Sequence, residues 1–292
     1  MLAGKFLEKY SGVEFTKMHG NGNDFVVFDE FEEVVVPEEE KSFFVKAVCD
    51  RRFGIGGDGV IFIQKSEVAD ARFRYFNSDG SEAEMCGNGI RCFARLAFER
   101  GYVKEKFRAE TLAGIKELEV SGNAVRVDMG NVLFSPEKIP AKGGNFDGVW
   151  RVEMEGWNVY AANTGVPHAV VFLDCEELER LDMEIAKKIR YSDAFPEGVN
   201  VNFACVSGEK IRVRTYERGV EGETLSCGTG SVGVAAIAYK LGLSSRNVKV
   251  VTRGGELLIE LVEDEKGGEM RAYMTGKAVK VFEGRLLELE LR

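Results

Sequence analysis

A four-residue segment occurs twice in the chain, and both copies have similar surroundings. Cys86–Gly89 (CGNG) returns 141 residues later as Cys227–Gly230 (CGTG). Each copy follows an apolar, strand-like run and a polar loop, and each opens a segment of helical character. A cysteine at a helix start has a lowered pKa, because the terminal amides and the helix dipole favour its thiolate. Two such thiols indicate paired chemistry.

Other landmarks repeat at nearly the same interval, which indicates a duplicated domain. The hairpin starts Thr111–Gly114 and Thr252–Gly255 are also 141 residues apart. The alternating pattern of Ile211–Tyr216 favours an antiparallel sheet with one face in a core. We predict an α+β fold of two pseudosymmetric domains, each a mainly antiparallel sheet or barrel wrapped around a central helix, with the active site in the cleft between them. The expected halves are 1–145, joined by 278–292, and 146–277.

The predicted helices differ in polarity. Segment 231–239 is apolar or small on every face, so it must be surrounded by protein. Its counterpart, 90–100, keeps a wet side through Arg91, Arg95, Glu99 and Arg100. Further helices are expected at 38–49 and 178–189, and a short, charged extension at 1–12.

Composition excludes several classes of function. A length of 292 residues suggests two domains, and 45% hydrophobic and 30% charged residues are typical of a globular protein. The net charge of −9 disfavours nucleic acid and anionic membranes as partners. The charged first ten residues and the lack of a long apolar run predict a cytoplasmic protein.

The cysteines are expected to be reduced thiols, not a disulfide framework. There are six of them, and Cys49, Cys92, Cys175 and Cys205 are interpreted as small buried apolar residues. With two histidines and no Cys-x-x-Cys pair, no metal site is expected.

The paired motif suits the inversion of a stereocentre. Amides at a helix start can bind a carboxylate, and glycines permit close backbone approach. One cysteine as thiolate and the other as thiol can supply a base and an acid, one on each face of an amino acid. Arg218 near the substrate carboxylate would help to stabilise the developing carbanion. This chemistry needs no bound cofactor.

Three further features have competing interpretations. His168 could cap a strand, or it could orient or accept a proton beside a thiol. Glu217 could be a solvated strand-end charge or a group that helps to activate Cys227. The glycine-rich run 54–59 resembles a dinucleotide loop, but a strand and not a helix is expected after it.

From residue 15 onward the sequence closely resembles the diaminopimelate epimerase family, whose members are cofactor-independent and interconvert LL- and meso-diaminopimelate. The resemblance rests on the motifs at 17–25, 54–58, 77–92, 167–168, 195–200, 217–218 and 227–230. It implies Cys86 and Cys227 as the acid and base pair, with His168 and Glu217 assisting. It also implies a homodimer in lysine and cell-wall precursor synthesis, a final strand at 285–291 that returns to the first domain, and substrate contacts from Asn23, Asn77, Gly87, Asn88, Asn200, Glu217, Arg218, Gly228 and Thr229.

Two alternatives stay open at this point. Val166 stands where many relatives have asparagine, and Gly59 replaces a glutamine of some relatives, so the chain could be a two-thiol racemase of another amino acid, of proline or histidine type. A member of a different class would be a thiol redox protein that uses a Cys86–Cys227 disulfide.

Overall fold

The chain forms two compact units in the computed structural model, which describes residues 9–263 and 269–288. Unit 1 consists of Met1–Val127 and Gly276–Arg292, and unit 2 of Asp128–Thr275. The chain leaves unit 1 within β8 (Ala124–Val132) and returns to it within β18 (Met270–Lys277). A division of the functional halves at residue 145 stays a prediction. The expectation for residues 1–8 lies outside the described residues.

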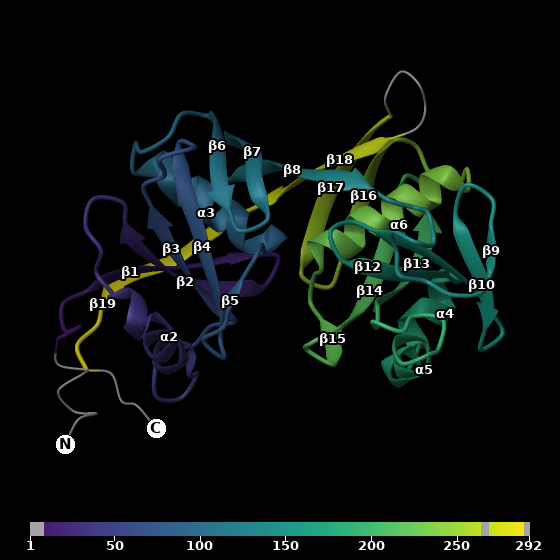
Figure 1. Ribbon diagram of the computed structural model, residues 1–292, viewed down its shortest axis with the longest axis horizontal. Helices are drawn as coiled ribbons and strands as arrows, with labels where there is room; N and C mark the ends of the chain where they lie inside the picture. Colours follow the sequence, from purple (N-terminus) through teal and green to yellow (C-terminus); the bar gives the residue numbers. More distant parts are fainter. Residues whose placement is uncertain (1–8, 264–268, 289–292) are drawn as a thin grey trace. The chain divides into compact units, whose positions relative to one another are not determined.

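Unit 1 is a mixed sheet with a helix against it (Figure 1). In hydrogen-bonded order, β19, β1 and β2 are antiparallel, β2 and β3 are parallel, and β3 and β4 are antiparallel. β4 then pairs with β5 and, in parallel, with β6, which continues antiparallel into β7 and β8. The remaining bounds are β1 (Glu14–Gly20), β2 (Asn23–Glu30), β3 (Gly59–Gln64), β4 (Ala71–Asn77), β5 (Glu82–Ala83), β6 (Lys106–Thr111), β7 (Gly114–Ser121) and β19 (Val279–Arg285).

Unit 2 repeats this order of pairing. β9 to β12 are antiparallel, β12 and β13 are parallel, and β13 and β14 are antiparallel. β14 pairs with β15 and, in parallel, with β16, which continues antiparallel into β17. The bounds are β9 (Asn145–Phe146), β10 (Trp150–Met154), β11 (Trp157–Asn163), β12 (Pro167–Phe172), β13 (Asn200–Ser207), β14 (Lys210–Glu217), β15 (Gly222–Thr224), β16 (Asn247–Thr252) and β17 (Gly255–Glu263).

Each sheet curves around one long helix. α3 (Gly87–Glu99) contacts β1, β2, β3, β4 and β7, and α6 (Gly228–Lys240) contacts β11 to β14, β16 and β17. Every residue from Gly230 to Ala238 is buried, as expected for a helix without a polar face. The predicted architecture of two similar α+β halves, each with a central helix, is therefore confirmed.

The outer face of each sheet carries a second core. In unit 1, η1 (Glu38–Glu40) and α2 (Lys41–Cys49) connect β2 to β3, and Phe44 packs with Phe28 and Phe62. In unit 2, the connection from β12 to β13 is α4 (Cys175–Arg180), η2 (Met183–Ile185) and α5 (Ala186–Arg190), over a core around Trp150 and Phe203.

Three details of the predicted elements are wrong. The single helix expected at 178–189 is broken, because Leu181 is extended and Asp182 begins a new turn by accepting a hydrogen bond from the Glu184 amide at 3.0 Å. Arg91 does not lie on a wet side of α3 but is fully buried. The last described strand covers Val279–Arg285 and pairs with β1 in unit 1. Residues 286–288 of the strand expected at 285–291 are not in a strand, and 289–291 lie outside the described residues.

The prediction of six reduced cysteines is wrong for one pair. Cys175 at the start of α4 and Cys205 in β13 form a disulfide, with Cα atoms 5.2 Å apart. The two residues are 30 positions apart, and they meet only because α4 packs on β13. The other four cysteines carry thiols. Cys49 and Cys92 are buried as expected, and burial raises the pKa of each thiol to about 12.

We predict that the Cys175→Ser variant unfolds more easily than the wild type. Cross-linking a loop of this length restricts the unfolded chain and stabilises the protein by about 3–4 kcal/mol. Chemical denaturation of the whole protein should show this loss in the fluorescence of Trp150 and Trp157, which both lie in unit 2. A strong reductant should shift the wild type by a similar amount and leave the variant unchanged. Equal stability of oxidised wild type and variant would contradict a stabilising role.

Candidate active site: two helix-start thiols

Cys86 is the N-cap residue of α3. Its backbone is extended, and its sulfur accepts a hydrogen bond from the Gly89 amide at 3.4 Å. The thiol also donates to Asn23 Oδ1 at 3.7 Å. With a donor and an acceptor in contact, the site can accommodate both thiolate and thiol, which a group that takes and returns a proton requires.

Asn23 is oriented by a charged cluster. Its amide nitrogen donates to Asp58 at 2.7 Å, which turns its oxygen toward Cys86 and toward the Asn88 amide, 3.3 Å away. Arg51 donates to Asp58 at 2.9 Å and to Asp24 at 2.6 Å. Partial burial raises the pKa of Asp24, but hydrogen bonds from Arg51 and Lys17 outweigh it and lower the pKa to about 2. Asp24 therefore stays ionised at neutral pH and anchors Arg51, and Arg51 in turn holds the Asp58 carboxylate that fixes the amide of Asn23.

Arg91 braces the same helix start from inside the unit. Its guanidinium donates to Asn21 at 3.1 Å and to Asn88 at 2.9 Å. Asn21 adopts a positive φ of 53°, a conformation that asparagine tolerates better than most residues. Burial lowers the pKa of Arg91 to about 10, so it remains a cation at neutral pH. A buried positive charge thus lies close to the start of α3.

Cys227 is the N-cap residue of α6 and is 5% exposed. Its sulfur lies 3.4 Å from the Thr229 hydroxyl, and either group can be the donor. Like Cys86, it therefore has a neighbour that suits both protonation states. The Ser231 hydroxyl and the Ser231 amide both donate to the Cys227 carbonyl, at 2.9 Å each. These bonds fix the turn that presents the thiol.

His168 lies in β12 against the same helix start and is fully buried. Gly230 makes this possible: a Cβ at that position would overlap Asn202 Oδ1 and would lie 3.3 Å from both Cys227 Sγ and His168 Cε1. Burial, with a smaller contribution from the charge of Arg218, lowers the pKa of His168 from 6.5 to about 3. The imidazole is therefore neutral at physiological pH.

The remaining predicted residues of unit 2 lie at the ends of β13 and β14. The Arg218 amide donates to Asn200 Oδ1 at 2.7 Å, and its guanidinium donates to the Glu197 carbonyl at 2.9 Å. Glu217 accepts a hydrogen bond from Thr224 at 2.9 Å. Asn200 is 5% exposed, whereas Glu217 and Arg218 are half-buried. Their polar ends are thus held by their own unit.

The predicted residues form local groups within each unit. Cys86, Asn23 and Asn88 are in contact, and Gly87 is the first residue of α3. Asn77 ends β4 and donates to Ser81 at 3.1 Å. In unit 2, Cys227, Thr229 and His168 share one helix start, with Gly228 as the first residue of α6.

Several residues at these sites were not predicted from the sequence. They are Asn21, Asp58 and Arg91 in unit 1 and Asn202 and Thr215 in unit 2. The Gly-x-Gly loop before β2 indicates backbone freedom near Asn21. No pattern along the chain shows that Asn202 faces His168.

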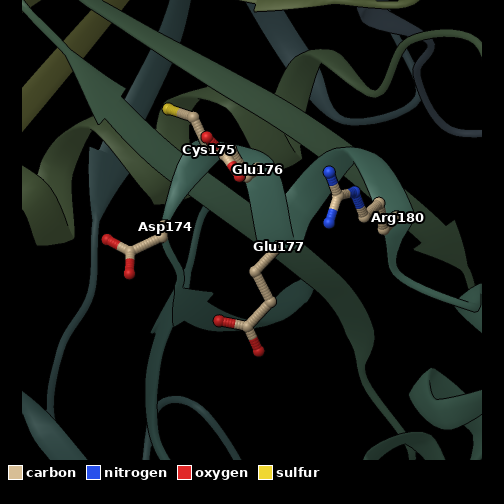
Figure 2. A pocket seen from close by; sticks show the side chains of 5 residues that line it. All are labelled: Asp174, Cys175, Glu176, Glu177 and Arg180. Atoms are coloured by element: carbon tan, nitrogen blue, oxygen red, sulfur yellow. The ribbon is translucent and has the colours of Figure 1, made fainter.

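The described residues contain no group of three or more His, Cys, Asp and Glu side chains arranged to hold a metal ion. Within residues 9–263 and 269–288, no helix is both long and apolar enough to cross a membrane. A surface pocket lies over α4, lined by Asp174, Cys175, Glu176, Glu177 and Arg180 (Figure 2). It shares no residue with the groups around Cys227, and its cysteine is in the disulfide.

The fold is shared with solved structures of the phenazine biosynthesis PhzF family and of a hydroxyproline epimerase. A PhzF-family protein from Bacillus anthracis has a TM-score of 0.70 at 18% identity, over 94% of this chain and 99% of that chain. A hydroxyproline epimerase from Agrobacterium vitis has a TM-score of 0.61 at 16% identity, over 94% of this chain and 92% of that chain.

Sequence comparison narrows this class. A sequence model described as diaminopimelate epimerase matches residues 15–135 and 160–281. Proteins of that name from Archaeoglobus fulgidus and Methanocella arvoryzae are 61% and 52% identical, over 96% and 94% of this chain and 98% and 96% of theirs. The chain belongs to the diaminopimelate epimerase family. It is an isomerase, an amino-acid epimerase, and the expected family resemblance is confirmed.

We predict that two equivalent glycines respond differently to alanine. Gly230→Ala should lower the free energy of unfolding by about 1–3 kcal/mol, because the new methyl group would overlap Asn202. Gly89→Ala meets Ile61 and Phe25 only at ordinary contact distances of 3.4 and 3.5 Å, so it should be neutral or stabilise the helix by up to about 1 kcal/mol. Denaturant titration measures both. Equal losses of unfolding free energy in the two variants would contradict the difference in packing between Gly230 and Gly89.

We also predict a proton-linked loss of stability at low pH. Because folding depresses the pKa of His168, the unfolded chain binds a proton that the native protein excludes. This stabilisation is present above about pH 6.5 and is lost as the pH falls toward 3. Between pH 6 and 4, wild-type stability should fall more steeply than that of His168→Gln, by roughly 1.4 kcal/mol per pH unit. Parallel stability curves would show that His168 is protonated in the folded protein.

Proposed function

We propose that this epimerase interconverts LL- and meso-diaminopimelate by a two-thiol mechanism with Cys86 and Cys227. The observation that carries the proposal is the equivalent place of the two sulfurs. Each is the N-cap of the helix that its sheet surrounds, and each touches groups that suit both thiol and thiolate. The names of the relatives supply the substrate.

In the proposed reaction, one cysteine thiolate removes the α-proton from one face of the substrate and becomes a thiol. The carbanion then takes a proton from the other cysteine, on the opposite face, and that thiol becomes a thiolate. The substrate loses one proton and gains one, so the reaction balances without a cofactor. In the reverse direction the two cysteines exchange roles.

The substrate carboxylate suits the start of the central helices. The first amides of α3 and α6 have no partners within the helix, and they favour an anion together with the helix dipole. The carbanion spreads its charge onto the same carboxylate, so donors there stabilise the transition state. Arg218 can add its charge, because the carbonyls of Glu197 and Gly198 hold its guanidinium.

The other predicted contacts complete the proposal. Asn23, Asn77, Asn88, Asn200 and Thr229 offer amide and hydroxyl groups to the substrate, Gly87 and Gly228 permit close approach, and His168 and Glu217 assist the thiols. We further propose a cytoplasmic homodimer that acts in lysine and cell-wall precursor synthesis.

A racemase of another amino acid is the competing proposal. It arises in part because Gly59 stands where some relatives have glutamine. A side chain at Gly59 would overlap the Phe76 carbonyl and the Tyr75 ring, so a glutamine cannot replace glycine without movement of β4. Recognition of the distal end of the substrate must therefore differ from that of relatives with glutamine at this position.

The test is exchange of the α-proton with heavy water, measured on the reduced enzyme for a panel of amino acids. We expect exchange with diaminopimelate, and a loss of turnover of roughly 100-fold or more in Cys86→Ser and in Cys227→Ser. Cys92→Ala is the matched control, since that thiol is fully buried in α3. Exchange with another amino acid but none with diaminopimelate would reject the substrate. Full activity of either Cys→Ser variant would reject the mechanism.

A further inference from the structure

The two helix starts differ in the side chains that pack against their glycines, Gly89 and Gly230. Besides the N-cap cysteine of each helix, the side chains nearest to Gly89 are Phe25 and Ile61, and those nearest to Gly230 are His168 and Asn202. Strand register makes the positions correspond: Phe25 pairs with Gly59 as His168 pairs with Asn200, and Val27 pairs with Ile61 as Val170 pairs with Asn202. One step further, Ile61 faces Tyr75 and Asn202 faces Thr215.

The apolar residues of unit 1 are thus replaced by a polar chain in unit 2. The Thr215 hydroxyl donates to Asn202 Oδ1 at 2.9 Å, and Asn202 Nδ2 donates to the Ala169 carbonyl at 2.9 Å. These two bonds fix which end of the amide is nitrogen. That nitrogen lies 3.2 Å from His168 Nδ1. His168 and Asn202 are fully buried and Thr215 is 3% exposed, so the network is shielded from water.

The orientation of the amide determines the tautomer of the imidazole. Because Asn202 presents a donor, Nδ1 of His168 must accept, and the proton of the neutral ring is on Nε2. Nε2 is buried and has no hydrogen-bond partner among the described residues. It is bonded to Cε1, the ring atom that approaches the start of α6 beside Cys227. An unpaired buried donor is costly, so its retention at this place points to a ligand or reaction partner that accepts from it.

We propose that Asn202, oriented by Thr215, is a positioning residue that holds His168 as the neutral Nε2–H tautomer. His168 then acts at the start of α6 as a hydrogen-bond donor toward negative charge, and not as a base. Asn202 and Thr215 act only through the imidazole. If the network had only a structural role, it would also satisfy these buried groups, but the activity of the enzyme would not depend on which ring nitrogen of His168 carries the proton.

The tautomer can be observed directly, because the chain contains only two histidines. We would label the wild-type protein with ¹⁵N-histidine and assign His168 by comparison with His19→Gln. At pH 7 we expect an unprotonated Nδ1 and a protonated Nε2. A protonated Nδ1 in the wild type would overturn the proposal. This measurement needs no substrate, so it stands apart from the proposed function.

Variants then test the positioning role. Asn202→Asp places a carboxylate at Nδ1, which can only accept, so the ring should carry a proton on Nδ1. With diaminopimelate as substrate, we expect kcat to fall by roughly 10- to 100-fold with little change in KM, as when the partner that orients a catalytic histidine is lost. Thr215→Val should lower kcat to a smaller extent, and Thr252→Val, which removes another buried hydroxyl in unit 2, should not.

The outcomes separate this proposal from the proposed function, on which the kinetic test rests. An inverted tautomer with unchanged kcat in Asn202→Asp would overturn the positioning role. Equal kcat in Thr215→Val and Thr252→Val would overturn the part assigned to Thr215. If Asn202→Asp does not fold, the ¹⁵N spectrum of wild-type His168 and the kcat of Thr215→Val still test the proposal. A correct tautomer in an enzyme that does not exchange diaminopimelate would reject the proposed substrate alone.

Discussion

The structure of each unit depends on burying a central helix, and in unit 2 this helix has no polar face. α6 can exist only inside a sheet that surrounds it, and the strands of unit 2 provide this with their buried faces. The helix start is then the place where backbone polarity remains unsatisfied within the helix. Cys86 and Cys227 both occupy this place, so the packing that folds each unit also positions its cysteine.

Much of the fold could be predicted, because the duplication is visible in short motifs. The central helices, the sheet class and Cys86 and Cys227 as N-caps follow from patterns that are local in sequence. The broken helix near Asp182 could have been inferred from a capping aspartate, although the apolar spacing favoured continuity. The buried Arg91 was mistaken because a long cation in an amphipathic segment usually lies in water, and only the fold brings Asn21 to its guanidinium.

The contacts that orient the site were beyond prediction for a simple reason. Asp58 reaches Asn23 across 35 positions, and Asn202 reaches His168 across 34, so neither pair leaves a periodic pattern. The same holds for the disulfide across 30 positions. Periodicity predicts which face of a strand is buried, whereas parallel pairing of distant strands determines which buried side chains meet.

The disulfide divides the six cysteines of the chain into one bonded pair and four free thiols. Cys175 and Cys205 lie in one unit, where packing of α4 on β13 keeps them close in every folded molecule. Cys86 and Cys227 belong to different units, so packing inside a unit does not hold them together. A mild oxidant can therefore close the Cys175–Cys205 pair within a single folded unit. The thiol or disulfide state of Cys175 and Cys205 is thus a property of unit 2 alone.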